Sequence, residues 1–274
     1  STQPSRMLGR LFKTAAAVPP RTAACERILK AVHRAEPKVV LDLGCTDPSV
    51  FATLATQVEK VVGLLKVDAE DIDDAQVLKE LKSELRSFNV EPAVMIGGVM
   101  PQFDNDFDAV VTEDMLSYMP EGVEGILQEV HGTLRPGGVF VGEIGADGNL
   151  ETFRMACYDI LREEGIDAMP HDPYYFPTDM EMKKLLQAAG FEVKAMNQIN
   201  HKAVFPCKLG REDMALLDYM HLGMGSPFLR ALPDAAARRK MVQEVTHMCY
   251  SSMFQEAKWT YQSIRLQFTA VKPG

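Results

Sequence analysis

The stretch VVLDLGCTDPSVFATL, Val39 to Leu54, decides the fold. It opens with a short apolar run of the kind that forms a buried strand, and Gly44 then supplies a turn residue. The segment that follows Pro48 leads back along the sheet. The stretch therefore predicts a strand, a glycine turn and a helix in direct succession.

The same alternation of short apolar runs and helical segments continues along the chain. Seven strands are predicted at Lys38–Leu43, Lys60–Leu65, Ala93–Ile96, Phe107–Thr112, Val139–Ile144, Phe191–Ile199 and Ser263–Val271. Strands that alternate with helices indicate a parallel sheet covered on both faces. The sequence therefore predicts an α/β fold with a doubly wound, mostly parallel, seven-stranded sheet.

Local signals place several helix ends. Residues 126, 127, 130 and 134 put four apolar side chains on one helix face. The turn Arg135-Pro136-Gly137-Gly138 is expected to end that helix. Thr178 and Glu181 form the pattern of a capping box, before a helix over Met182–Ala189 that stops at Gly190.

The chain is expected to contain a single large α/β core. We assign residues 1–24 to an N-terminal arm, 25–199 to the core, 200–260 to a helical lid inserted before the last strand, and 261–274 to that strand. Residues 1–25 carry four basic side chains and no acid, which fits either a loose arm or an organelle transit peptide. The expected location is cytoplasmic, with a mitochondrial one as the alternative.

Composition narrows the class of partner. The formal net charge of −9 argues against nucleic acid, whose phosphates are bound by Lys and Arg. Five scattered cysteines without a CxxC pair, and six histidines without ligand spacing, predict neither a disulfide framework nor a metal site. No apolar run reaches the roughly 20 residues of a membrane span.

The glycine loop occupies the place where doubly wound sheets bind their ligands. A nicotinamide fingerprint would read G-x-G-x-x-G, and residues 44–49 read GCTDPS. A dinucleotide is therefore not predicted here.

Four motifs in order carry a family resemblance: LDLGC (41–45), VVGLL (61–65), FDAVVTEDMLSYMP (107–120) and LRPGGVFVGEI (134–144). They resemble the class I methyltransferases that use S-adenosylmethionine (SAM), a family with a Rossmann-like fold. Further segments, among them PYYFPTDMEMKKLLQAAGFEV (173–193) and KWTYQSIRLQF (258–268), are similar to methyltransferases related to trans-aconitate methyltransferase. That group implies a small-molecule acceptor.

The resemblance implies a set of cofactor-binding positions. They are Asp42, Gly44, Cys45, Thr46, Leu65, Gly98, Glu113 and Asp114. Several depart from the family: Thr46 and Pro48 replace glycines, Leu65 stands where an acid usually holds the ribose, and Gly98 where an acid usually holds the adenine. The site is thus degenerate. Asp68 could supply a ribose ligand or a helix cap, and Glu113 and Asp114 could line the pocket or a solvated loop.

The resemblance also suggests acceptor-binding positions at Tyr118, Tyr175, Trp259 and Arg265. An aromatic wall with one guanidinium would suit an apolar or carboxylated substrate, although core packing explains the same side chains equally well. No general base stands out, and methyl transfer to a carboxylate needs mainly alignment and exclusion of water.

Three functions follow from these observations. The first is a SAM-dependent methyltransferase that acts on a small molecule at a carboxylate or hydroxyl oxygen, with no catalytic residue assigned. The second is a methyltransferase-like protein that has lost SAM and serves as a partner subunit or ligand-binding scaffold. The third is a SAM-independent natural-product enzyme. The chain is compatible with a homodimer or a heteromeric partner.

Overall fold

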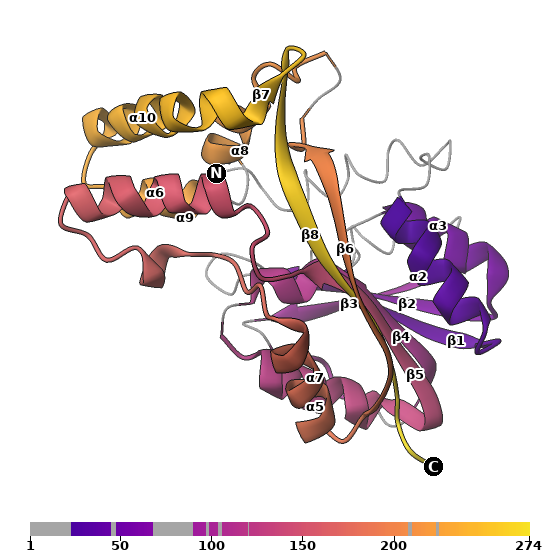
Figure 1. The fold of residues 1–274 in the computed structure, drawn as a ribbon. Helices are drawn as coiled ribbons and strands as arrows, with labels where there is room; N and C mark the ends of the chain where they lie inside the picture. Colours follow the sequence, from indigo (N-terminus) through magenta and orange to yellow (C-terminus); the bar gives the residue numbers. More distant parts are fainter. Residues whose placement is uncertain are drawn as a thin grey trace. The chain divides into compact units, whose positions relative to one another are not determined.

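The computed structural model describes residues 23–44, 48–67, 90–96, 99–103, 106–119, 121–207, 210–222 and 225–274 (Figure 1). The chain divides into two compact units. The first comprises Ser1–Ile144, Pro177–Asn197 and Leu266–Gly274, and the second comprises Gly145–Phe176 and Gln198–Arg265.

The central sheet confirms the α/β prediction. Its seven main strands are β1 (Val39–Leu43), β2 (Lys60–Val67), β3 (Val90–Ile96), β4 (Phe107–Glu113), β5 (Leu134–Gly145), β6 (Glu192–Val204) and β8 (Lys258–Val271). They follow the order β3-β2-β1-β4-β5-β8-β6, and the pairs from β3 to β5 are parallel. Strands β2 and β3 are added on one side of β1, and β4 and β5 on the other. The topological switch point of the sheet therefore lies between β1 and β4.

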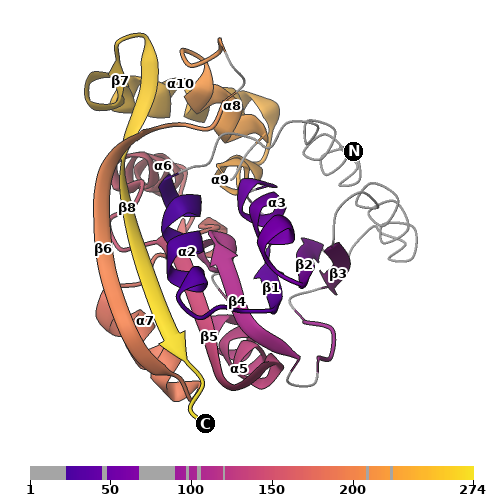
Figure 2. The same cartoon turned by 90° about the vertical axis from the view of Figure 1, so that its right-hand side faces the viewer.

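Helices cover both faces of the sheet in the first unit. Helices α2 (Ala23–His33) and α3 (Pro48–Gln57) lie on one face, and α5 (Val123–Thr133) and α7 (Asp179–Ala188) on the other (Figures 1 and 2). Cys25, Ile28 and Val32 of α2 pack with Phe51 and Leu54 of α3 in one buried cluster. This cluster is why an amphipathic helix that precedes β1 is held against the strands.

The predicted helix signals are largely confirmed. All four apolar residues at 126, 127, 130 and 134 are buried. The capping box is formed, because the Glu181 N–H donates to Thr178 Oγ1 at 3.2 Å and the Thr178 N–H donates to Glu181 Oε2 at 2.9 Å. Helix α7 begins at Asp179, three residues earlier than predicted, and Gly190 follows it with φ +98°.

The expected turn at Arg135-Pro136-Gly137-Gly138 is wrong. Helix α5 ends at Thr133 and β5 begins at once, with a register shift opposite β4 between Phe107 and Ala109. The N–H of Gly137 donates to the Lys272 carbonyl, and the Lys272 N–H donates to the Gly138 carbonyl, both at 2.9 Å. Pairing with the distant C-terminal segment therefore keeps these residues in the sheet as a bulge.

The second unit contains more of the chain than the predicted lid. It holds α6 (Glu151–Glu163), α8 (Ala215–Leu222), α9 (Ser226–Arg230), α10 (Ala235–Met253) and β7 (Phe254–Gln255), which pairs with β8. Phe153 of α6 lies 5.7 to 6.2 Å, between ring centroids, from Phe205, Tyr219 and Phe228. This shared aromatic core groups residues 145–176 with the helices after β6.

Candidate cofactor site at the carboxyl edge of the sheet

The loop after β1 is built around Gly44. Its φ is +107°, a conformation that favours glycine, and its N–H donates to the Leu64 carbonyl at 2.8 Å. A Cβ added there would lie 2.6 Å from Cβ of Met115. Glycine is therefore required both by the backbone and by the close approach of the β4 loop.

The rest of the loop is described in part. Cys45, Thr46 and Asp47 lie outside the described residues, so their roles stay predictions. Pro48 is the first residue of α3, where a helix makes no use of the backbone N–H. A proline at this position is therefore compatible with the start of α3.

Asp42 lies on β1, two residues before Gly44. It pairs in register with Gly63 on one side and Val111 on the other, and it is 3% exposed. One residue further along, the last residue of β1 is tied to β4, because the Thr112 hydroxyl donates to the Leu43 carbonyl at 3.0 Å. A buried carboxylate is thus held at the carboxyl edge, close to the glycine turn.

The chain turns sharply after β4 at Glu113 and Asp114. Asp114 has φ +62°, and its N–H donates to the Glu143 carbonyl at 3.0 Å. The Ser117 N–H donates in turn to the Asp114 carbonyl at 2.8 Å, within the short 3₁₀ helix Met115–Tyr118. Of the predicted cofactor residues, the structure thus brings Asp42, Gly44, Glu113 and Asp114 to the carboxyl ends of two neighbouring strands, β1 and β4.

Sequence reasoning missed an ion pair at the same edge. Arg27 Nε and Nη2 of α2 donate to the two carboxylate oxygens of Glu143 on β5, at 2.7 and 2.5 Å. The Glu143 side chain is 1% exposed. The sequence offered one signal of this pair, which is that Glu143 lies inside the apolar run VFVGEI and so needs a partner when buried. Nothing in the sequence marked Arg27, 116 residues away, as that partner.

The second strand ends later than predicted. Leu65 pairs with Val94, and β2 continues to Val67, which pairs with Ile96. Leu65 is therefore inside the strand, and the residue that follows the strand is Asp68. Asp68 and Gly98 lie outside the described residues.

The predicted acceptor residues fall in both units. Tyr118 belongs to the first unit and is half-buried in the 3₁₀ helix after β4. Tyr175 and Arg265 are half-buried residues of the second unit. Trp259, also in the second unit, is 2% exposed, and its indole nitrogen donates to the Asp213 carbonyl at 2.8 Å. A pocket shared by these four side chains stays a prediction.

A charged network lies in the second unit beside its aromatic core. Arg154 Nη2 donates to Asp172 Oδ2 at 2.6 Å, and the Tyr158 hydroxyl donates to the same oxygen. The other carboxylate oxygen accepts the Tyr174 N–H at 3.0 Å. Burial and the hydrogen bond to Asp172 raise the pKa of Tyr158 to about 12, although Arg154 opposes the shift.

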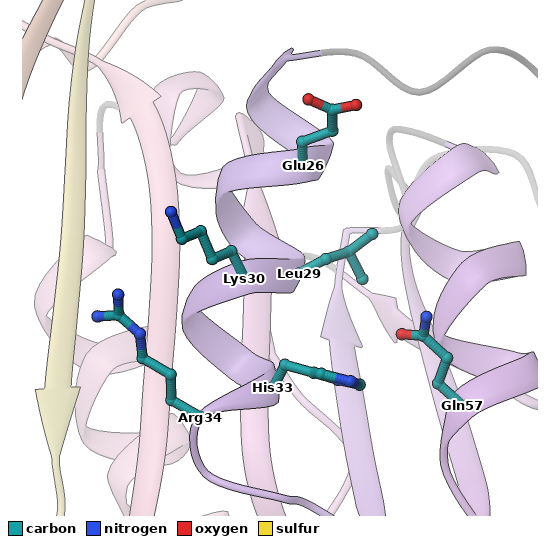
Figure 3. Close-up of a pocket in the computed structure, with 6 residues that line it drawn as sticks. All are labelled: Glu26, Leu29, Lys30, His33, Arg34 and Gln57. Atoms are coloured by element: carbon teal, nitrogen blue, oxygen red, sulfur yellow. The ribbon is translucent and has the colours of Figure 1, made fainter.

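A hollow of about 450 Å³ lies elsewhere in the first unit (Figure 3). Leu29 and His33 of α2 point toward Gln57 at the end of α3, whereas Lys30 and Arg34 point to the other side of α2. The hollow runs along α2 from Glu26 to Arg34, and His33, Arg34 and Gln57 lie just before the amino ends of β1 and β2. Its lining includes none of the predicted cofactor or acceptor residues, so the hollow is not the candidate site.

Comparisons with known proteins agree with this geometry. Residues 40–138 match the family described as "Methyltransferase domain". Over these residues the chain is similar to a methyltransferase domain. An uncharacterised methyltransferase of Schizosaccharomyces pombe, C70.08c, is 26% identical over 253 residues, covering 89% of this chain and 90% of the relative.

Solved structures show the same methyltransferase fold. A suspected methyltransferase from Bacillus halodurans C-125 is 16% identical with a TM-score of 0.56, over 91% of this chain and all of the other. A phosphoethanolamine N-methyltransferase from Haemonchus contortus, solved with phosphomonomethylethanolamine and S-adenosylhomocysteine, is 16% identical with a TM-score of 0.52, over 100% of this chain and 59% of the other. The resemblance to class I methyltransferases is thus confirmed.

The described part of the chain has neither a membrane-spanning helix nor a metal-binding cluster. None of its helices is long and apolar enough to cross a membrane. Within the same residues, no three His, Cys, Asp or Glu side chains gather in a way that could hold a metal ion.

Proposed function

We propose that the protein is a SAM-dependent methyltransferase that acts on a small molecule at a carboxylate or hydroxyl oxygen. One observation carries the proposal: the segment that matches the methyltransferase domain ends its strands at an edge where Gly44 packs against the β4 corner. That edge is the ligand-binding side of a doubly wound sheet.

The residues at this edge fit the cofactor. Gly44 gives the turn after β1 its positive φ, at the edge where the methionine part of SAM would lie, and Asp42 offers a buried carboxylate for its ammonium group. Glu113, the last residue of the neighbouring strand β4, and Asp114, the residue after it, add two carboxylates. When bound, SAM supplies a methyl group on a sulfonium, a good leaving group for attack by an oxygen nucleophile.

The chain's own part is to position the acceptor and exclude water. Tyr118, Tyr175, Trp259 and Arg265 are the side chains proposed to bind it. A carboxylate acceptor enters already deprotonated, so the absence of an assigned general base is consistent with this chemistry. The net charge of −9 favours a small molecule over nucleic acid.

Calorimetric titration of the purified chain with SAM and S-adenosylhomocysteine tests the proposal. We expect binding in the micromolar range, and Asp42→Asn should weaken it by about tenfold, as loss of a charged hydrogen bond predicts. Asp108→Asn is the matched control, because Asp108 lies on the same sheet at the opposite end of β4. No binding at hundreds of micromolar would reject the enzyme.

The rival, a chain that has lost SAM binding, rests on Leu65, Gly98 and Pro48, of which Leu65 and Gly98 stand where acids usually bind the cofactor. Two missing charged acceptors would cost roughly 3 to 6 kcal/mol, or a hundredfold to ten-thousandfold in affinity. If this rival is right, Leu65→Asp combined with Gly98→Asp should create SAM binding where the natural chain shows none. A natural chain that turns over SAM by itself would eliminate it.

A further inference from the structure

The ion pair between Arg27 and Glu143 lies beside the candidate cofactor site, on α2 and β5, and not among the residues assigned to that site. Glu143 lies on β5 and pairs in register with Glu113 on β4, while Thr112, the residue before Glu113, is level with Leu43 of β1. The pair therefore stands at the same level of the sheet as Gly44, two strands away.

A chain of contacts leads from Arg27 to Gly44. The guanidinium holds the Glu143 carboxylate through two hydrogen bonds, and the Glu143 carbonyl accepts the N–H of Asp114. Asp114 is the left-handed corner that directs Met115, and the Met115 side chain packs directly against Gly44. Every link lies in the first unit.

The energetics of burial make this linkage strong. A carboxylate that is 1% exposed is costly unless a cation satisfies both of its oxygens, and the planar fork of arginine does so with fixed geometry. Cys25, Ile28 and Leu29 fix α2 against the sheet on either side of Arg27. Helix α2 therefore acts as a rigid support for the end of β5.

We propose that Arg27 and Glu143 are positioning residues that set the Asp114–Met115 corner against the Gly44 turn and so tune affinity for the cofactor without touching it. The inference rests on the proposed function, since it names what regulates the same site. It predicts that a substitution that weakens the pair makes the Asp114–Met115 corner more mobile and lowers the affinity for the cofactor. The substitution that weakens the pair more should have the larger effect on both.

Two variants with a matched control test the proposal. Arg27→Lys keeps the charge but loses the two-pronged contact, and Arg27→Gln removes the charge. S-adenosylhomocysteine affinity should fall about threefold to tenfold in Arg27→Lys and more in Arg27→Gln. Arg135→Gln breaks the ion pair to Asp108 at the other end of β4 and β5, and it should leave the affinity within twofold of the natural chain.

Hydrogen exchange separates this inference from the proposed function. The amides of residues 113–119 should exchange faster in both Arg27 variants without ligand, and should not change in Arg135→Gln. Unchanged affinity and unchanged exchange in folded Arg27→Lys and Arg27→Gln would overturn the inference. If the natural chain binds no S-adenosylhomocysteine, the proposed function fails, and the exchange rates alone still decide whether the pair holds the corner.

Discussion

At the scale of single residues, Gly44 combines two reasons for being glycine. Its φ of +107° is unfavourable for any side chain, and a Cβ would collide with Met115 at 2.6 Å. We expect Gly44→Ala to lower the free energy of unfolding by about 2 to 4 kcal/mol, from backbone strain of roughly 1–3 kcal/mol together with overpacking. Urea unfolding measures the loss.

Gly137 supplies the control for this substitution. Its φ is +81°, and nothing lies within 4 Å of the position a Cβ would take. Gly137→Ala should therefore cost only the backbone part, roughly 1 kcal/mol. Equal losses in the two variants would show that the contact with Met115 contributes nothing.

Tyr158 predicts an alkaline effect on stability. Burial and its hydrogen bond to Asp172 raise its pKa to about 12 in the folded chain, above the value of about 10 in an unfolded one. The neutral phenol therefore stabilises the fold fully below about pH 10, and this contribution is lost as the pH rises toward 12. Tyr158→Phe should remove that part of the alkaline decline.

The measurement is the unfolding free energy between pH 8 and pH 12. Tyr250, which is 54% exposed, is the matched control, and Tyr250→Phe should follow the curve of the natural chain. A Tyr158→Phe curve parallel to that of the natural chain would contradict the assignment of the raised pKa to this network.

At the scale of elements, Asp108 ties three strands together at the amino end of the sheet. Its Oδ2 accepts the N–H groups of Lys38 and Val39 at 2.9 and 2.8 Å, and its Oδ1 accepts Arg135 Nη1 at 2.7 Å. Burial raises the pKa of Asp108. The hydrogen bonds from Val39, Lys38 and Arg135 together lower it by more, so the pKa lies below its ordinary value. The ionised carboxylate thus holds the start of β1 and the bulge of β5 to β4.

Asp108→Asn should lower the free energy of unfolding by about 1 to 3 kcal/mol at pH 7. A depressed pKa stabilises the fold above the unfolded value near 3.9 and loses this contribution as the pH falls, so the variant should decline less steeply in acid. Urea unfolding at pH 7 and pH 3 measures both effects. Asp159→Asn breaks an exposed pair with Arg162 and should change stability by less than about 1 kcal/mol.

The strands and helices were predictable because their signals are local. Each apolar run carried its own burial pattern. The capping box that begins α7 is likewise contained in the four residues from Thr178 to Glu181. The bulge after α5 was not predictable, because the sequence of residues 135–138 fits a turn equally well. Only the pairing with Lys272, more than 130 residues away, decides between the two.

The candidate site was predictable in the same measure. Asp42, Gly44, Glu113 and Asp114 lie at the carboxyl ends of β1 and β4, and neighbouring parallel strands bring these ends together. The Arg27–Glu143 pair depends on how α2 lies across the strands, which no local pattern specifies. The length of β2 likewise depends on its register with β3, and this register moves the end of the strand from Leu65 to Val67.

At the scale of the whole molecule, the division into two units limits which residues a ligand at the carboxyl edge can stabilise directly. The residues of that edge all belong to the first unit, whereas the aromatic core around Phe153 belongs to the second. Cofactor binding should therefore protect the first unit most. Hydrogen exchange with bound S-adenosylhomocysteine should slow in residues 40–44 and 112–119 more than in α6 or α10.

Ligand choice gives a final prediction for the whole chain. A ligand at one hundred times its Kd stabilises the folded state by about 2.7 kcal/mol, which corresponds to several degrees in Tm for a chain of this size. S-adenosylhomocysteine should produce this shift. NAD at the same concentration should not, because residues 44–49 read GCTDPS and lack the glycines that admit a pyrophosphate. A shift with NAD and none with S-adenosylhomocysteine would mean that the edge built by Gly44 and the β4 corner serves a dinucleotide instead.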